Sequence, residues 1–210
     1  MKDLIEYLSN RTYPGRTIAA GMTEDNKLYM VYILQGRSEN SRNRVLVNID
    51  NTIHTFPKDE SKVQNRDLVI YKALLEDDDY IYLTNGDQGE SIKNCGDIEE
   101  GIKERTFEND PPIYTSRIGA IYSKKENVLK FFIIKKDLEQ TKRIIWTYKL
   151  VPGYAHVIHT YEEDLSSFSS DPVLIKVTDS DLLNIFDNEN TISCLVKVDD
   201  DVKIVNRGDL

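Results

Sequence analysis

The sequence predicts an α+β fold in which one β-sheet packs on another and a few helices lie outside them. Three polar turns, "TEDN", "EDDD" and "KKEN", each separate two apolar runs, which is the pattern of a β-hairpin. The runs "LVIY", "FFII" and "CLVKV" are almost continuously hydrophobic, which indicates strands covered on both faces. Helical signals are fewer, so sheet packed on sheet is the natural arrangement.

The elements follow from the same patterns. We expect helices over residues 2–9 and 91–105, and a further helix over "DLLNIF" that Ser180 could cap. The three hairpins predict pairs of strands, and "RVLVNID" adds a strand after the first pair. The predicted strands cover residues 17–21, 29–35, 44–50, 67–75, 80–85, 117–123, 128–136, 143–150, 156–161, 191–198 and 202–207.

Composition indicates a soluble globular protein and argues against large anionic partners. Hydrophobic residues make up 40% of the 210 residues and charged residues 30%, too apolar a mixture for a disordered chain. No linker, repeat or low-complexity segment interrupts the chain, so we expect one domain over residues 1–210. The net charge of -9 argues against nucleic acid and membranes as partners. A local cluster of arginines could still bind a small anion.

The predictions for cellular location and cofactors rest mainly on the absence of recognisable targeting and metal-binding motifs in the sequence. No signal peptide or membrane-spanning stretch is recognisable, and Cys95 and Cys194 form no motif, which favours the cytoplasm. His156 and His159 lie three apart in a strand and so point to opposite faces, which makes a shared metal improbable. No serine nucleophile motif occurs. We therefore expect neither a metal nor another cofactor, and the sequence leaves a homo-oligomer open.

Polar residues gather at three predicted strand ends, where ligand-binding groups usually lie. "GRSENSRNR" (36–44) could hold a phosphate and a sugar, although composition alone favours a solvated turn. "TNGDQGESI" (84–92) is typical of a turn, although its amides and carboxylates could also contact a ligand. "FENDPPIYTSRI" (107–118) carries two acids that could do acid–base chemistry, although surface acids beside a proline loop are commoner.

In order along the chain, these segments resemble the archaeal-type IMP cyclohydrolase family. The resemblance rests on "YPGRTIAAGM" with the later asparagine–arginine pair of "SRNRVL", on the tyrosine strand and asparagine–glycine of "DLVIYKALLEDDDYIYLTNG", on "FENDPPIYTSRIGAIY", and on "HTYEED". Together these motifs cover roughly residues 13 to 165. Ser116 stands where the family usually has proline, and "GDQGES" replaces a more threonine-rich run.

The resemblance implies a fold, a reaction and a site. The fold would be a four-layer αββα sandwich similar to that of the N-terminal-nucleophile hydrolases, without their processed nucleophile. The reaction would be closure of 5-formamidoimidazole-4-carboxamide ribonucleotide to IMP with loss of water. Carried over residue by residue, the catalytic positions are Arg44, Tyr71 and Glu108, and the substrate-binding positions are Arg37, Asn43, Asn85, Thr115 and Arg117.

Each position has an expected task in ring closure. Arg44 or Tyr71 would donate a hydrogen bond to the formyl oxygen, and Glu108 would transfer protons. Arg37 and Arg117 would face the phosphate or the base. One alternative is a purine-nucleotide-binding protein that kept the pocket and lost the reaction, which Ser116 and the altered run after Asn85 favour. An unrelated hydrolase on the same sandwich ranks last, because no nucleophile can be identified.

Overall fold

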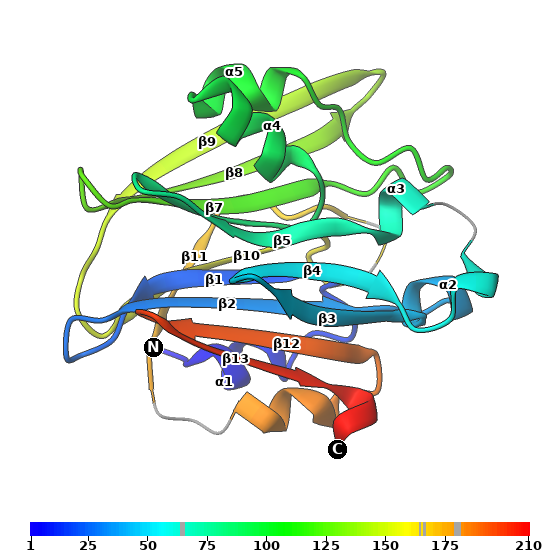
Figure 1. Cartoon of the computed structure of the whole chain (residues 1–210), viewed down its shortest axis with the longest axis horizontal. Helices are drawn as coiled ribbons and strands as arrows, with labels where there is room; N and C mark the ends of the chain where they lie inside the picture. Colours follow the sequence, from blue (N-terminus) through cyan, green and yellow to red (C-terminus); the bar gives the residue numbers. More distant parts are fainter. Residues whose placement is uncertain (64–65, 164, 166, 179–181) are drawn as a thin grey trace.

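The structure is a computed structural model that describes residues 1–63, 66–163, 165, 167–178 and 182–210. Within these residues the strands form two sheets, and every pair of neighbouring strands is antiparallel (Figure 1). In spatial order, the six-stranded sheet consists of β11 (Val173–Lys176), β10 (Tyr154–His159), β1 (Thr17–Met22), β2 (Leu28–Gln35), β12 (Thr191–Val198) and β13 (Asp201–Asn206).

The second sheet has seven described strands that follow chain order without a crossover. They are β3 (Arg44–Ile49), β4 (Thr52–Pro57), β5 (Tyr71–Glu76), β6 (Tyr80–Thr84), β7 (Arg117–Ser123), β8 (Val128–Asp137) and β9 (Gln140–Lys149). This sheet is a meander, because each strand pairs with the next one along the chain. The three predicted hairpins are confirmed as β1–β2, β5–β6 and β7–β8.

The main hydrophobic core lies between the two sheets. Met30 and Tyr32 of β2 meet residues such as Ala73 and Phe131 of the other sheet in one buried cluster. Because side chains alternate along a strand, their neighbours point to the outer faces. Phe132 is one such neighbour and is also fully buried. The prediction that "FFII" is covered on both faces is therefore confirmed.

Short helices cover only parts of the outer faces. On the seven-stranded sheet these are α4 (Gln88–Cys95) and α5 (Ile98–Lys103), and on the six-stranded sheet α1 (Leu4–Leu8) and the 3₁₀ helix η2 (Leu182–Asp187) (Figure 1). The remaining helical turns are α2 (Glu39–Arg42), η1 (Glu60–Lys62), α3 (Arg66–Val69) and η3 (Arg207–Asp209). Among the described residues, no helix has the length and apolar character needed to cross a membrane.

The expected four-layer αββα sandwich is wrong. The described residues form two stacked antiparallel sheets, but the few helices among them are single turns or pairs of turns and do not make two helical layers. The comparison with N-terminal-nucleophile hydrolases falls with that expectation. The four-layer form was implied by the family resemblance, and the sequence patterns could not correct it, because apolar strand patterns indicate that a sheet face is covered but not whether long helices or short turns cover it.

Several element boundaries also differ from the predictions. The helix expected over residues 91–105 is two helices, because Gly96 adopts φ 68° and ends α4. The strand expected from residue 67 begins at Tyr71, because α3 occupies the preceding turn. Strands β4 and β11 were not predicted. The proposed cap at Ser180 lies outside the described residues, and the segment after it forms η2 rather than an α-helix.

Candidate functional site

Strand ends from both sheets meet at one end of the sandwich, the right-hand end in Figure 1, where α2 and α3 lie. Because neighbouring strands are antiparallel, the start of one strand lies beside the end of the next. In one sheet Thr17 at the start of β1 pairs with His159 at the end of β10. In the other, Tyr71 at the start of β5 pairs with Thr55 near the end of β4. Residues distant in sequence therefore come together here.

The centre of this end is a buried ion pair between Arg16 and Glu108. Nη2 of Arg16 lies 2.5 Å from Oε1 of Glu108, and the two side chains are 10% and 8% exposed. Burial raises the pKa of Glu108 above its usual value, and the Arg16 and Arg117 guanidinium groups limit this rise. Nε of Arg16 is buried and has no hydrogen-bond partner among the described residues. It is a donor available to a ligand.

The backbone before Arg16 fixes where this arginine points. Gly15 adopts φ 73°, a conformation that favours glycine. A Cβ at this position would lie 2.2 Å from Oγ1 of Thr160 and would also meet the Tyr161 ring. The amide of Arg16 donates to Oγ1 of Thr160 at 3.1 Å. The close approach of the two segments thus requires glycine and aims Arg16 between the sheets.

A pair of tyrosine hydroxyls lies beside the ion pair. The hydroxyls of Tyr32 and Tyr71 are 2.7 Å apart, and both residues are buried. The charge of Arg16 acts on both hydroxyls, and the charge of Arg44 acts on Tyr32. Two hydroxyls have two hydrogens and their mutual bond uses one. Since the described residues give neither hydroxyl a second partner, one hydrogen remains free to be donated.

A second network fixes the loop that carries Glu108. The amide of Glu108 donates to the carbonyl of Thr115 at 2.8 Å. Oγ1 of Thr115 contacts the carboxylate of Asp110 at 2.5 Å and the hydroxyl of Tyr161 at 2.6 Å. Asp110, the second acid of the predicted acid–base pair, therefore holds the loop together. Glu108 is the carboxylate that points into the cluster.

His159 holds the backbone of Tyr161 in place through a hydrogen bond. Its Nδ1 donates to the carbonyl of Tyr161, and its Nε2 accepts from the hydroxyl of Tyr7 at 2.8 Å. A carbonyl can only accept, so the Nδ1–H tautomer is required. Burial lowers the pKa of His159 to about 4, so the ring is neutral near pH 7. Both ring nitrogens are thus used in hydrogen bonds that support the loop structurally.

We call the residues Arg16, Tyr32, Arg44, Tyr71, Glu108, Thr115 and Tyr161 the buried polar cluster. A family profile described as IMP cyclohydrolase-like protein matches residues 13–203, a range that contains the whole cluster. The chain belongs to this family. The family resemblance seen in the sequence is therefore confirmed. No curated protein matches the chain.

The three catalytic positions expected from the family resemblance, Arg44, Tyr71 and Glu108, all lie in the buried polar cluster. Arg44 is 4% exposed, and it donates through Nε to the carbonyl of Ser41 at 2.8 Å and through Nη2 to the carbonyl of Gln35 at 3.3 Å. These bonds hold its guanidinium group against β2 and leave Nη1 for another partner. The geometry thus brings together three residues that are far apart in the sequence.

Asn85 and Arg117 belong to a neighbouring network at the β6–β7 junction. Oδ1 of Asn85 accepts from the amide of Ile118 at 2.8 Å, and its Nδ2 donates to the carbonyl of Ser116 at 3.1 Å. Nη1 of Arg117 donates to Asp87 at 2.8 Å, although its charge still acts on Glu108. The structure commits both side chains to protein partners, and their role in substrate binding stays a prediction.

Arg37 and Asn43 lie apart from the cluster, in a surface pocket of about 540 Å³. We call it the basic pocket. The guanidinium of Arg37 sits 5.0 Å from the centre of the Tyr13 ring, and that ring stacks on Tyr161 of the cluster. The pocket is thus joined to the cluster through two aromatic rings. Its lining residues are Arg37, Glu39, Arg42, Asn43, Lys58, Asp59 and Lys62.

Sequence reasoning missed Arg16, Tyr32 and Tyr161 as site residues. Arg16 and Tyr161 lie in "YPGR" and "HTYEED", two motifs that carried the family resemblance, so a signal existed. Tyr32 lies in a strand that reads as pure core. Only the need of a buried tyrosine hydroxyl for a partner could have indicated it.

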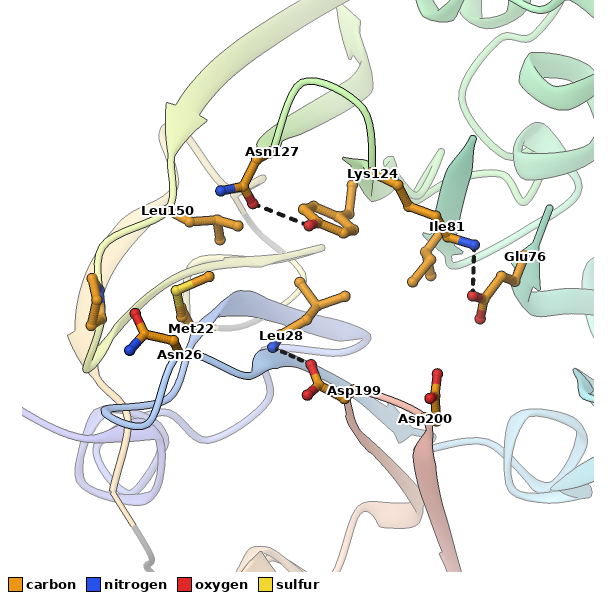
Figure 2. A pocket seen from close by; sticks show the side chains of 12 residues that line it. Met22, Asn26, Leu28, Glu76, Ile81, Lys124, Asn127, Leu150, Asp199 and Asp200 are labelled. Atoms are coloured by element: carbon orange, nitrogen blue, oxygen red, sulfur yellow. Dashed lines mark hydrogen bonds and ion pairs between the residues drawn. The ribbon is translucent and has the colours of Figure 1, made fainter. Parts of the chain in front are cut away.

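A larger pocket, of about 770 Å³, lies at the opposite end of the sandwich (Figure 2). Several of its polar groups are paired: Lys124 bonds Glu76 at 2.9 Å, and Asp199 accepts from the amide of Leu28 at 2.8 Å. Within the described part of the chain, no group of three or more His, Cys, Asp or Glu could hold a metal ion. The buried polar cluster is therefore the better candidate, since it contains a charge pair and unused donors.

Proposed function

We propose that this protein is an IMP cyclohydrolase that closes 5-formamidoimidazole-4-carboxamide ribonucleotide to IMP with loss of water. The family is the first support. The observation that carries the proposal is the buried Arg16–Glu108 pair beside the Tyr32–Tyr71 hydroxyls. A shielded acid–base group next to hydrogen-bond donors suits a reaction that forms an oxyanion and moves protons.

The chemistry requires no group from outside the substrate other than protons. The carboxamide nitrogen attacks the formyl carbon, a C–N bond forms, and the formyl oxygen takes up the electron pair and then a proton. The resulting carbinolamine loses its hydroxyl group and the proton of the former formamido nitrogen as water, which leaves the C=N bond of the new ring, while the former carboxamide nitrogen keeps its hydrogen. Both reacting groups sit on one imidazole, so the site chiefly has to select the reactive rotamer.

Donors to the formyl oxygen come from the tyrosine pair and the arginines. The free hydroxyl hydrogen of the Tyr32–Tyr71 pair can be donated to the developing oxyanion, with the positive charge of Arg16 nearby. Arg44 has Nη1 left for the same oxygen or for the carboxamide oxygen. A fixed donor at an oxyanion is worth on the order of 10²–10³ in rate.

Glu108 is the proton-transfer group in this proposal. In the addition it accepts the proton that the attacking nitrogen gives up and delivers it to the formyl oxygen. In the dehydration it accepts the proton of the former formamido nitrogen and delivers it to the departing hydroxyl. Burial raises its pKa toward neutrality, which brings its proton affinity closer to the working pH. Proton transfer by a positioned side chain contributes roughly 10²–10⁴ in rate. Arg16 positions the carboxylate through their ion pair.

The experiment is to incubate the purified protein with the formamido ribonucleotide and to follow IMP by chromatography. The proposal predicts one IMP for each substrate consumed, at a rate proportional to protein concentration. Tight binding of IMP together with no conversion would favour the alternative, a purine-nucleotide-binding protein without activity. The ion pair between Arg16 and Glu108 supports that alternative, because each side chain already uses part of its hydrogen-bonding groups on the other and has fewer left for catalysis.

A further inference from the structure

We propose that a pocket between α1 and η2 binds an α-amino acid with an apolar side chain, and that this ligand holds in place the turn that carries Arg16. The pocket has a volume of about 300 Å³ and lies on the outer face of the six-stranded sheet, where α1 contacts η2 (Figure 1). We call it the helix pocket. Small-molecule pockets measure about 300–1,000 Å³, so this one suits a ligand of few atoms.

The positive charge in the helix pocket belongs to Arg11. Its guanidinium group lies 3.9 Å from the centre of the Tyr7 ring, and its Nη1 donates to the carbonyl of Tyr7 at 2.9 Å. These contacts fix the plane of the group. Among the described residues, Arg11 has no carboxylate partner, and its buried Nε has no hydrogen-bond partner. The edge formed by Nε and Nη2 matches the two oxygens of a carboxylate, which would satisfy both donors.

The negative charge in the helix pocket belongs to Asp187, at the end of η2. In the part of the chain that the structure describes, its carboxylate forms no ion pair, with Arg11 or with any other cation. Two opposite charges that line one small pocket without pairing suit a ligand that carries both charges. An α-amino acid does so, with its carboxylate on Arg11 and its ammonium group on Asp187.

The side chain of the ligand has an apolar wall to contact. Ile5 and Leu8 of α1 and Ile185 of η2 line the helix pocket. All three belong to the hydrophobic cluster on the outer face of the six-stranded sheet. An aliphatic ligand side chain that packs against them is removed from water, which favours binding. The chemistry of the pocket therefore points to an aliphatic amino acid such as leucine.

Two further residues of the helix pocket connect it to the buried polar cluster. The carbonyl of Pro14 accepts from the amide of Tyr161 at 3.1 Å. Oε1 of Gln35 accepts from the amide of Gly15 at 3.2 Å. Pro14 and Gly15 directly precede Arg16 in the chain. A ligand that packs against Pro14 and Gln35 therefore restrains the turn that aims Arg16 between the sheets.

The expected effect of the ligand is activation. The pocket exists in the same structure in which Arg16 pairs with Glu108, so a ligand that fits it binds this arrangement and favours it. Coupling between two sites is reciprocal, so the amino acid and IMP should each raise the affinity of the other. This coupling rests on the proposed function, because it assumes that IMP binds in the buried polar cluster. Binding of the amino acid goes beyond that function and does not depend on it.

The first experiment measures binding by calorimetry of three probes: leucine, isocaproate, which lacks the amino group, and isopentylamine, which lacks the carboxylate. We expect leucine to bind the wild type at least about tenfold more tightly than either of the others, as for one charge-assisted contact. Arg11→Lys keeps the charge but loses the planar fork, and Asp187→Asn removes the negative charge. Each should weaken leucine binding at least about tenfold. Asp201→Asn, at the exposed start of β13, is the matched control and should bind leucine as the wild type does.

The second experiment titrates IMP into the wild type with and without saturating leucine. We expect leucine to raise the affinity for IMP roughly fivefold or more. The same leucine concentration should have less effect on Asp187→Asn, because less of the variant binds leucine.

A wild type that does not bind leucine would overturn the inference, as would equal affinity for all three probes. Unchanged leucine affinity in both pocket variants would overturn it as well, and IMP affinity that ignores leucine would overturn the coupling. The two proposals can fail separately. If the wild type makes IMP but binds no leucine, the function stands and the helix pocket is wrong. If it binds leucine through Arg11 and Asp187 but makes no IMP, the amino-acid site stands and the function is wrong.

Discussion

At the residue scale, burial of the Arg16–Glu108 ion pair carries a large desolvation free energy. Removing two charges from water costs several kcal/mol per ion, and replacement of a buried pair by apolar side chains is often neutral or stabilising. The pair here lies at a strand end beside two hydroxyls rather than deep in the core. Its position is easier to explain by chemistry on a bound substrate than by stability of the fold.

Tyr71→Phe tests the hydroxyl donor. The variant keeps the ring and therefore the packing, but it removes one of the two paired hydroxyls. We expect kcat for IMP formation to fall at least tenfold, which is about 1.4 kcal/mol of barrier. Tyr122→Phe is the matched control, because its hydroxyl bonds Asn127 at the opposite end of the sandwich. Equal kcat values for the two variants would show that the Tyr71 hydroxyl takes no part.

The sequence predicted part of this cluster and not the rest. Tyr71, Glu108 and Arg44 follow from family motifs, and the structure connects them through two further residues, Arg16 and Tyr32. Tyr32 could not be predicted, because its role comes from a contact with Tyr71 across the two sheets. Nor could the sequence separate Arg44, which is buried, from Arg37, which faces the basic pocket. Such contacts depend on how the sheets stack.

At the element scale, β3 is an edge strand that is tied to the other sheet by a side chain. Oδ1 of Asn206 accepts from the amide of Leu46 at 2.9 Å, and Nδ2 of Asn206 donates to the carbonyl of Leu46 at 3.3 Å. The side-chain amide thus pairs with β3 as a neighbouring strand would. Oδ1 also accepts from the hydroxyl of Ser193 at 2.7 Å. This bridge closes the edge next to the start of β3, where Arg44 lies.

Asn206→Ala should lower the free energy of unfolding by about 1–3 kcal/mol, because it leaves the backbone groups of Leu46 without partners. Asn206→Asp keeps the acceptor but loses the donor, so its loss should be smaller at low pH, where the carboxyl is protonated and can donate. Urea denaturation of both variants provides the measurement. An unchanged unfolding midpoint for Asn206→Ala would show that the bridge contributes nothing.

The elements themselves were predicted best where a polar turn separates two apolar runs. Strand β4 was missed because its turn, Asp50–Asn51, follows "RVLVNI" without the usual glycine, although both residues adopt positive φ. The division of the helix over residues 91–105 depends on Gly96 in the left-handed conformation. A single glycine in a helical pattern is often tolerated, so the sequence alone could not settle this break.

At the scale of the whole molecule, His159 makes stability depend on pH. Burial lowers its folded-state pKa from 6.5 to about 4. Between these values the unfolded chain binds a proton that the folded chain does not, so the free energy of unfolding falls as the pH falls through this window. The loss should be on the order of 3 kcal/mol by pH 4 and absent above pH 7.

His159→Asn isolates this effect, because asparagine has no charge to gain and can still donate to the carbonyl of Tyr161. Glu108 has a raised pKa and therefore acts in the opposite direction, but it is present in both proteins and cancels in the difference. Chemical denaturation from pH 4 to 7 should show a flatter profile for the variant. Parallel profiles would mean that His159 is protonated in the folded state.

The arrangement of the whole molecule was the hardest part to predict. Two antiparallel sheets with a core between them follow from the strand patterns. The four-layer form came from the resemblance and is wrong, since short helices cover only parts of each outer face. Stacking nevertheless places strand ends of both sheets side by side, and this convergence is what assembles the buried polar cluster.

We propose that the buried polar cluster closes the purine ring, and Glu108→Gln tests this proposal most directly. Glutamine keeps the shape of the side chain and removes its charge and its capacity to accept a proton. The measurement is kcat for IMP formation in the wild type and the variant, with IMP affinity determined on the same preparations. We expect the wild type to form IMP, and the variant to bind IMP but turn over at least tenfold more slowly, about 1.4 kcal/mol of barrier. Near-wild-type turnover by Glu108→Gln, or a wild type that binds IMP and never forms it, would contradict the account.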